Sequence, residues 1–150
     1  MRKFIAADPD RCTGCRICEM VCSAVKEGEF NARLSRIRTT WVTPYLVTSL
    51  ACRLCEEPAC VRSCPQGALS VDEEKGVILV DEERCVGCGL CVKACEFNAI
   101  TLHPGRKVVI VCDLCGGEPK CVEFCPKGAL GLRTAEEIAQ RNEMFRKLLP

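Results

Sequence analysis

Sixteen cysteines in a chain of 150 residues constrain this sequence more than any other feature. They form four groups of four, and none is left over. The groups are Cys12, Cys15, Cys18, Cys22; Cys52, Cys55, Cys60, Cys64; Cys85, Cys88, Cys91, Cys95; and Cys112, Cys115, Cys121, Cys125. Thiols at such short and regular spacing indicate either a disulfide scaffold or a set of metal sites.

The groups repeat in an ordered way along the chain. Groups one and three share the spacing C-x2-C-x2-C-x3-C, whereas groups two and four have a wider middle gap and are followed by Pro65 and Pro126. The flanking residues repeat too, since DPDRCTGCRICEMVC is similar to DEERCVGCGLCVKAC. The sequence therefore indicates an internal duplication, whose main departure from symmetry is an insertion between Cys22 and Cys52.

This spacing is typical of iron-sulfur proteins. A [4Fe-4S] cube needs four thiolates, and the run C-x2-C-x2-C-x3-C-P supplies three of them locally while its fourth cysteine binds the other cluster of a pair. Groups one and three have Ser23 and Glu96 in place of the proline, which removes no ligand. We therefore predict four [4Fe-4S] clusters with all sixteen cysteines as ligands.

The pairing of the groups follows from the central stretch, which matches a complete two-cluster ferredoxin. Groups two and three are expected to exchange their fourth cysteines, and groups one and four then pair by elimination, although pairing within each tandem copy is topologically possible. The expected ligand sets are Cys12, Cys15, Cys18 with Cys125; Cys112, Cys115, Cys121 with Cys22; Cys52, Cys55, Cys60 with Cys95; and Cys85, Cys88, Cys91 with Cys64. Such sharing places the cubes close together, so that electrons can hop along a row.

The expected fold class is α+β: two interleaved bacterial-type two-cluster ferredoxin modules with short hairpins and short helices, plus a C-terminal helix. The inner module is expected at 52–102, the outer module at 1–51 together with 103–133, and a docking helix at 134–150. The runs GALSV, GVILV, AITL and KVVIV predict hairpins, and the last cysteine of each group is expected to enter a short helix. In the tail, Thr134 and Glu137 form a predicted capping box, with an apolar face of Ile138, Phe145 and Leu148.

Two other uses of the cysteines agree less well with the sequence. Structural zinc usually takes two separated pairs of ligands, whereas here three cysteines fall within seven residues. A disulfide scaffold would suit an exported protein, but the start MRKFIAADPDRC has neither an apolar core nor twin arginines. We therefore expect a cytoplasmic protein without direct membrane insertion. A formal net charge of +1 gives no global field for binding nucleic acid.

Other residues have a structural and a functional interpretation. His103, the only histidine, is expected to be a solvated turn residue rather than a ligand. Trp41 and Tyr45 lie in the insertion and form either an interface anchor or part of the local core. The basic residues of the insertion form either a docking site for an acidic partner or a solvated face: Arg33, Arg36 and Arg38. No catalytic constellation is present in the sequence, so we do not expect an enzyme.

The whole chain resembles the four-cluster ferredoxin-like subunits of the dimethyl-sulfoxide-reductase iron-sulfur family. The resemblance rests on CTGCRICEMVC, CRLCEEPACVRSCP, CVGCGLCVKAC and CDLCGGEPKCVEFCP. It implies a non-catalytic electron-transfer subunit, paired with a molybdenum or tungsten pterin enzyme, in which groups one and four form the outer pair and groups two and three the inner pair.

Within that family, the segment CSAVKEGEFNARLSRI is most similar to the electron-transfer subunits of tungsten-containing aldehyde oxidoreductases. That resemblance implies a cytoplasmic complex of an anaerobe, with electrons passing to ferredoxin or to a flavin subunit that reduces NAD. The alternatives are a free polyferredoxin, a subunit of a carbon monoxide dehydrogenase, hydrogenase or formate dehydrogenase complex, and a zinc-binding interaction module. A row of clusters also suggests possible higher-order assembly.

Overall fold

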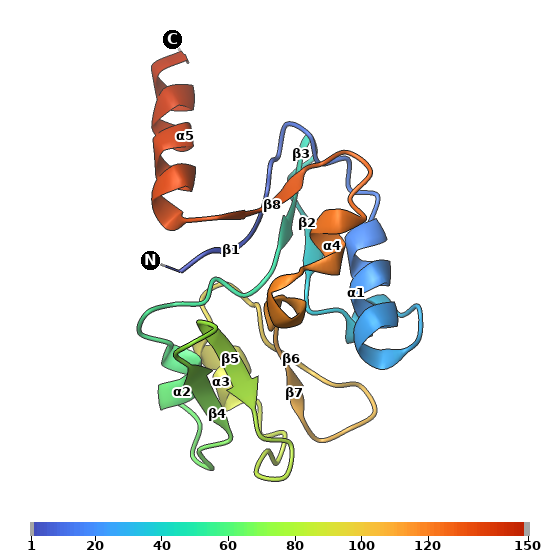
Figure 1. The fold of residues 1–150 in the computed structure, drawn as a ribbon, viewed down its shortest axis with the longest axis vertical. Coiled ribbons are helices and arrows are strands. Elements are labelled where there is room, and N and C mark those ends of the chain that lie inside the picture. The colour runs from blue at the N-terminus through green and yellow to red at the C-terminus, as the bar shows by residue number, and fades with distance from the viewer. Residues whose placement is uncertain (1, 149–150) are drawn as a thin grey trace.

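The structure, a computed structural model, describes the backbone of residues 2–148 and the side chains of residues 2–141. It is a mixed fold of small sheets and short helices, as the α+β prediction requires, while the interleaving of two modules stays a prediction (Figure 1). Within the described part of the protein, every helix is too short or too polar to cross a bilayer.

The largest sheet joins the two ends of the chain to the insertion. Its strands are β1 (Phe4–Ala7), β2 (Arg38–Thr43), β3 (Leu46–Leu50) and β8 (Leu130–Arg133), in the order β2-β3-β1-β8. All pairs are antiparallel, and β1 runs along β8 from Phe4 opposite Arg133 to Ala7 opposite Leu130. We did not predict this sheet, because β1 and β8 are short and find each other only across the length of the chain.

The predicted hairpins are confirmed. They are β4 (Leu69–Asp72) with β5 (Val77–Val80), and β6 (Thr101–Leu102) with β7 (Val109–Ile110). The helices are α1 (Ile17–Glu27), α2 (Ala59–Arg62), α3 (Leu90–Ala94), α4 (Lys120–Glu123) and α5 (Ala135–Leu148), with two 3-10 turns, η1 (Ala32–Leu34) and η2 (Leu114–Gly117).

The helices place the cysteines differently from our expectation. Each short helix carries the third cysteine of its group, and in groups two, three and four the fourth cysteine lies just beyond the helix end. Only in group one does the helix continue through the fourth cysteine, Cys22, because α1 runs on to Glu27. The prediction that the last cysteine enters the helix was therefore wrong for three groups.

Helix contacts link groups that are distant in sequence. Helix α1 packs against α4, and α2 packs against α3. In Figure 1, α1 and α4 lie beside the four-stranded sheet, whereas α2 and α3 lie beside the β4–β5 hairpin. One buried cluster spans both parts, and among its hydrocarbon members are Phe4, Ile37, Ile78, Ile100 and Leu114. The module boundaries predicted above remain a prediction.

The C-terminal helix begins at the predicted capping box. The Thr134 amide donates to the Glu137 carboxylate at 2.8 Å, and the Glu137 amide donates to the Thr134 hydroxyl at 3.2 Å. Ile138 packs against the buried cluster, and Arg141 donates to the Asp8 carboxylate at 2.6 Å. The side chains of Phe145 and Leu148 lie outside the described residues. The docking role of this helix is taken up below as a proposal.

The cysteine loops share one unusual backbone feature. In every group the residue before the second cysteine has a positive φ: Gly14 (70°), Leu54 (49°), Gly87 (68°) and Leu114 (57°). Leucine is costly in this region, but both leucines are buried in the core. At Gly87 a leucine would also be crowded, because a Cβ there would lie 3.0 Å from the carbonyl carbon of Lys107.

This contact generates a prediction. Gly87→Ala should destabilise the protein more than Gly28→Ala, since both residues have a positive φ but a Cβ at Gly28 would meet nothing within 4 Å. Gly28→Ala should cost about 1–2 kcal/mol from backbone strain alone. The denaturant midpoint for loss of visible absorbance, compared after anaerobic reconstitution, measures the difference. Equal midpoints for the two variants would contradict the clash.

Candidate metal centres

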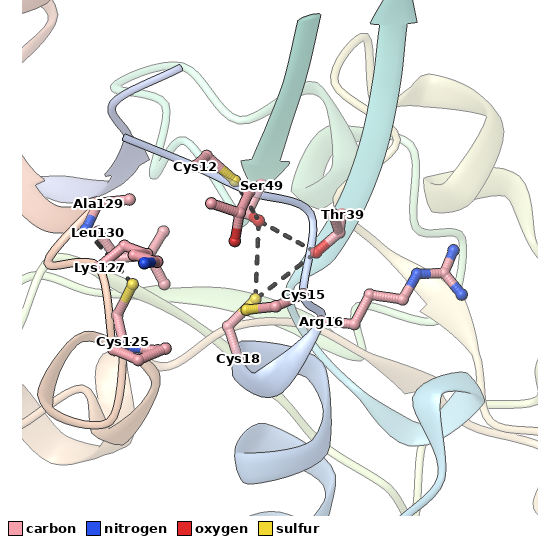
Figure 2. A pocket seen from close by; sticks show the side chains of 12 residues that line it. Cys12, Cys15, Arg16, Cys18, Thr39, Ser49, Cys125, Lys127, Ala129 and Leu130 are labelled. Atoms are coloured by element: carbon pink, nitrogen blue, oxygen red, sulfur yellow. Dashed lines mark hydrogen bonds between the residues drawn. The ribbon is translucent and has the colours of Figure 1, made fainter. Parts of the chain in front are cut away.

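The first site lies between the N-terminal loop and the segment after α4. Cys12, Cys15 and Cys18 border a pocket whose opposite wall carries Cys125 (Figure 2). Cys18 is buried at the start of α1, whereas Cys15 is exposed. The structure thus brings the fourth cysteine of group four to the first three cysteines of group one.

A second pocket is the counterpart of the first. It is bordered by Cys85, Cys88 and Cys91 of group three together with Cys64 of group two. Here Cys88 is the exposed cysteine. The same exchange of fourth cysteines therefore brings these four side chains together.

The other two gatherings are deeper. One pocket is bordered by Cys55, Cys60 and Cys95. The charges of these three residues raise the pKa of buried Cys52, which therefore lies close to them. The last gathering surrounds Cys121, whose pKa is raised by the charges of Cys112, Cys22 and Cys115, with a smaller contribution from Cys18 of the first site. The structure thus brings the sixteen cysteines into four gatherings, and the ligand set of each cluster is taken up below as a proposal.

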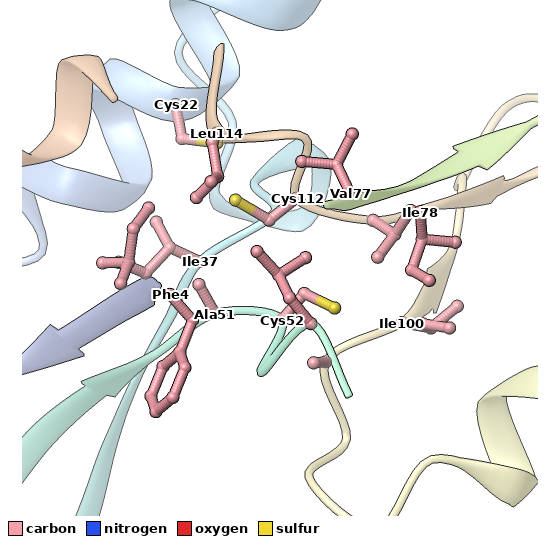
Figure 3. Close-up of a cluster of buried hydrophobic side chains, with 14 of the residues drawn as sticks. Phe4, Cys22, Ile37, Ala51, Cys52, Val77, Ile78, Ile100, Cys112 and Leu114 are labelled. Carbon is pink, nitrogen blue, oxygen red and sulfur yellow. The ribbon is translucent and has the colours of Figure 1, made fainter. Parts of the chain in front are cut away.

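The two deeper sets are neighbours. The charges of Cys22 and Cys52 both raise the pKa of Cys112, so both residues lie close to it. Figure 3 shows Cys22, Cys112 and Cys52 together among the buried side chains that join the two parts of the fold. Buried cysteines from both deep sets therefore meet in the core, whereas the exposed cysteines, Cys15 and Cys88, belong to the other two sets.

Backbone amides favour a thiolate at the fourth cysteines. The amides of Ala68, Ala99 and Ala129 donate to the sulfurs of Cys64, Cys95 and Cys125 at 3.3, 3.4 and 3.3 Å. In group one the donor to Cys22 is the amide of Arg36, at 3.2 Å. Burial would raise the pKa of the Cys64 and Cys125 thiols, but backbone hydrogen bonds outweigh it and lower the pKa of both.

Buried cysteines behave in the opposite way. Burial, with a smaller contribution from neighbouring thiolates, raises the pKa of Cys52 to about 12. Burial likewise raises the pKa of Cys112 to about 12 and that of Cys91 to about 11. Without a cation these thiols would stay protonated at neutral pH, so ionisation must accompany the binding of metal.

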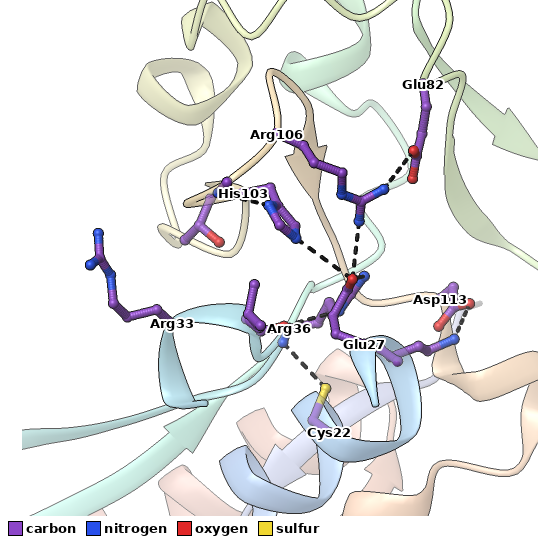
Figure 4. A network of polar contacts seen from close by, with 12 residues as sticks. Cys22, Glu27, Arg33, Arg36, Glu82, His103, Arg106 and Asp113 are labelled. Carbon is purple, nitrogen blue, oxygen red and sulfur yellow. Dashed lines mark hydrogen bonds and ion pairs between the residues drawn. The ribbon is translucent and has the colours of Figure 1, made fainter. Parts of the chain in front are cut away.

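A polar network around Glu27 joins α1 to the β6–β7 hairpin (Figure 4). The Glu27 carboxylate lies 2.5 Å from the Arg36 guanidinium, 3.1 Å from that of Arg106 and 3.6 Å from Nε2 of His103. Arg106 also reaches Glu82, at 2.7 Å. Burial raises the pKa of Glu27, but these positive partners outweigh it, so the pKa of the carboxyl lies below its ordinary value of 4.5.

Several polar and aromatic residues lie in other surroundings than the sequence predicts. His103 is not a solvated turn residue: only 11% of its side chain is exposed, because it folds onto Glu27. Arg36 and Arg38 do not form a solvated face, since Arg36 binds Glu27 and Arg38 donates to the carbonyls of Ala32 and Arg33. The core interpretation of the aromatic pair is also wrong, since Trp41 is 59% exposed and Tyr45 is 96% exposed.

Comparison with known proteins decides between the metal chemistries. A family model described as a 4Fe-4S dicluster domain matches residues 42–135, and a 4Fe-4S binding domain matches residues 9–26. This protein belongs to the 4Fe-4S dicluster family. As a member of this family with sixteen cysteines, it binds four [4Fe-4S] clusters, and the zinc and disulfide alternatives are set aside.

Relatives of this dicluster protein are subunits of larger oxidoreductases. It is 45% identical over 124 residues to the polyferredoxin-like subunit of an aliphatic sulfonate oxidoreductase from Pyrococcus furiosus, covering 83% of this chain and 72% of the relative. It is 33% identical over 155 residues to a subunit of the anaerobic dimethyl sulfoxide reductase of Escherichia coli, covering 90% and 75%. The resemblance to the dimethyl-sulfoxide-reductase iron-sulfur family is confirmed at this level.

A solved structure supports the same relationship. The dicluster protein matches a subunit in the active site complex BamBC of benzoyl coenzyme A reductase in complex with 1,5-dienoyl-CoA, with a TM-score of 0.51 and 27% identity. The match covers 96% of this chain and 90% of that one. The dicluster protein is thus an iron-sulfur electron-transfer protein related to subunits of oxidoreductases.

The residues present fit these clusters. Each gathering offers four sulfurs, and amide donors stabilise charge on the fourth of them. Among the side chains that the structure describes, no three ligating groups converge on a point that would hold a single metal ion. Bound clusters supply one-electron redox chemistry, while the protein provides thiolates, amide donors and an apolar surround.

The Glu27 network generates a second prediction. Glu27→Gln removes the charge that the Arg36 and Arg106 guanidinium groups share, and should lower the free energy of unfolding by about 2 kcal/mol at neutral pH. Because the pKa of Glu27 is depressed in the folded protein, this stabilisation is present above the ordinary value of 4.5 and is lost as the pH falls through the folded pKa.

Chemical denaturation of wild type and variant at several pH values checks this expectation. Glu57→Gln is the matched control, since Glu57 pairs with Arg62 on the surface, where 84% of the glutamate side chain is exposed. A gap between wild type and Glu27→Gln that widened as the pH fell would contradict the assignment.

Proposed function

We propose that this chain is the electron-transfer subunit of a multi-subunit oxidoreductase and performs no bond chemistry itself. The observation that carries the proposal is the arrangement of the cysteines: Cys15 and Cys88 are exposed in two different sets, while Cys52 and Cys112 of the other two sets meet in the core. Electrons can therefore enter at one exposed set, cross the two deep sets, and leave at the other.

We further propose the sixteen ligands in the four sets given by the sequence, with an inner module at 52–102 and an outer module at 1–51 with 103–133. Support comes from Cys125, which faces the group-one cysteines across their pocket, and from the packing of α1 on α4. In this arrangement the fourth ligand of each set comes from the partner group.

Double substitutions test this connectivity. If Cys12 and Cys125 bind one cluster, the double variant Cys12→Ser with Cys125→Ser should lose about four irons per chain relative to wild type. The control Cys12→Ser with Cys121→Ser removes ligands from two clusters, and should lose about eight. Iron analysis after anaerobic reconstitution distinguishes them, and a loss of about eight irons from the first variant would show that Cys125 binds elsewhere.

The partner we propose is a catalytic subunit with a tungsten or molybdenum pterin, most specifically a tungsten aldehyde oxidoreductase, in the cytoplasm of an anaerobe. Support comes from the segment CSAVKEGEFNARLSRI, which resembles the electron-transfer subunits of tungsten-containing aldehyde oxidoreductases. Electrons would pass to a ferredoxin or to a flavin subunit that reduces NAD. A sulfonate oxidoreductase is the second candidate, favoured by the 45% identity to the subunit of that enzyme.

The hairpin of β2 and β3 is our proposed contact with the catalytic subunit, and α5 a further docking element. Trp41 lies over Gly14, because a Cβ added at Gly14 would be 3.2 Å from the indole Cζ2. The exposed hairpin therefore adjoins the loop that carries Cys15. A partner seated on Trp41 and Tyr45 would bring its own redox centre close to the exposed set. Large aromatic side chains are also typical anchors of protein interfaces.

Anaerobic affinity purification of the tagged chain from its native source tests the function and the contact together. We expect roughly sixteen irons per chain and a co-purifying subunit with tungsten or molybdenum. Tyr45→Ala should lose that subunit without losing iron, whereas Phe30→Ala, which removes another aromatic side chain that is 78% exposed, should retain it. Full iron content without any redox partner in the wild type would favour a free polyferredoxin instead.

A further inference from the structure

Two hydroxyl groups lie against the cysteine sulfurs of the first site. The Thr39 hydroxyl is 3.6 Å from the sulfur of Cys18, and the Ser49 hydroxyl is 3.6 Å from the same sulfur and 3.9 Å from that of Cys12 (Figure 2). The two hydroxyl oxygens are 3.1 Å apart. A ligated thiolate has no proton, so each hydroxyl can act toward it only as a donor.

The fold holds this hydroxyl pair in place. Thr39 and Ser49 are directly opposite each other on β2 and β3, and both are buried. The amide of Thr39 donates at 2.7 Å to the carboxylate of Glu19, a residue of α1 that is itself only 3% exposed. The strand that carries Thr39 is therefore tied to the helix that carries Cys18, and the donors need no rearrangement to reach the sulfur.

The counterpart of this site lacks such donors. The pocket with Cys64, Cys85, Cys88 and Cys91 is walled by Leu69, Val86 and Val109, and Gln66, its one polar non-cysteine side chain among the described residues, is exposed. Both sites do receive an amide hydrogen bond, from Ala68 to Cys64 and from Ala129 to Cys125. Thr13, Arg16 and Lys127 also line only the first pocket, but the hydroxyls of Thr39 and Ser49 are the ones that lie against its sulfurs. This hydroxyl pair is carried by the insertion that breaks the internal duplication.

We propose that Thr39 and Ser49 raise the reduction potential of the cluster held by Cys12, Cys15 and Cys18, and thereby make the two exposed ends of the electron path unequal. Reduction by one electron places more negative charge on the thiolate sulfurs, and hydrogen bonds to sulfur stabilise that added charge. No bond is made or broken at these residues, and both hydroxyl protons stay on their oxygens. The inference rests on the proposed electron-transfer function and on the first ligand set.

The unequal ends would give the path a direction. An electron that reaches the end with Cys15 is held there more strongly than it would be at an end with apolar walls. Thr39 and Ser49 are positioning residues in this account, since they act through the cysteine ligands.

A redox titration of the full-length, anaerobically reconstituted chain, followed by electron paramagnetic resonance, tests the proposal without any partner protein. Thr39→Val with Ser49→Ala should keep the iron content of wild type and lower one of the four midpoint potentials, leaving the other three unchanged. Each single variant should produce a smaller shift. Thr39→Ser with Ser49→Thr keeps both hydroxyls and should restore the wild-type potential.

The matched control is Thr40→Val with Thr48→Ala. These two residues are the next cross-strand pair of the same hairpin, and they lie on its other face because side chains alternate along a strand. This variant should leave all four potentials unchanged. To assign the shifted cluster, the Thr39 and Ser49 substitutions are repeated in a chain that also carries Cys12→Ser and Cys15→Ser, where the three remaining potentials should not move.

The outcomes separate this inference from the proposed function. Four clusters with unchanged potentials in Thr39→Val with Ser49→Ala, or a shift that persists in the chain without Cys12 and Cys15, would overturn the inference and leave the electron-transfer function standing. A wild-type chain that fails to take up and release electrons reversibly would instead overturn the proposed function.

Discussion

Coordination of iron by thiolates from distant segments is the interaction on which this structure depends. Cysteines occupy much of the buried cluster that would otherwise be hydrocarbon, and the deep ones, such as Cys52 and Cys112, strongly resist ionisation while they carry no metal. Cluster binding and chain ordering are therefore coupled, because the ligands must lose protons in the same process that brings them together. The short strands and helices around them are too small to be stable alone.

The backbone is arranged to serve these sulfurs. Residues with positive φ precede the second cysteine of every group, and turns ending at Ala68, Ala99 and Ala129 aim an amide at the fourth. The positive φ lets the loop bend around a large inorganic group, and the amide donor stabilises negative charge on the sulfur. In the first copy of the repeat a longer helix replaces the turn, and the amide of Arg36 donates the hydrogen bond to Cys22 instead.

The parts of the structure that are repeated and local could be predicted from sequence. Cysteine spacing led to the four gatherings, and β-rich runs around tight turns led to the β4–β5 and β6–β7 hairpins. The four-stranded sheet could not be predicted, because the β1–β8 pairing depends on contacts between the two chain ends. Thr39 and Ser49 were missed as well. The length of the insertion marked the region, but only the register of β2 and β3 shows that two ordinary hydroxyl residues face sulfur.

The pairing of β1 with β8 also bears on how the protein is made. Strand β1 leaves the ribosome long before its neighbour β8, which ends only at Arg133. The β4–β5 hairpin, in contrast, is complete once Val80 has emerged. The β4–β5 hairpin can thus form before β8 has been synthesised, whereas the four-stranded sheet cannot be completed until β8 has emerged.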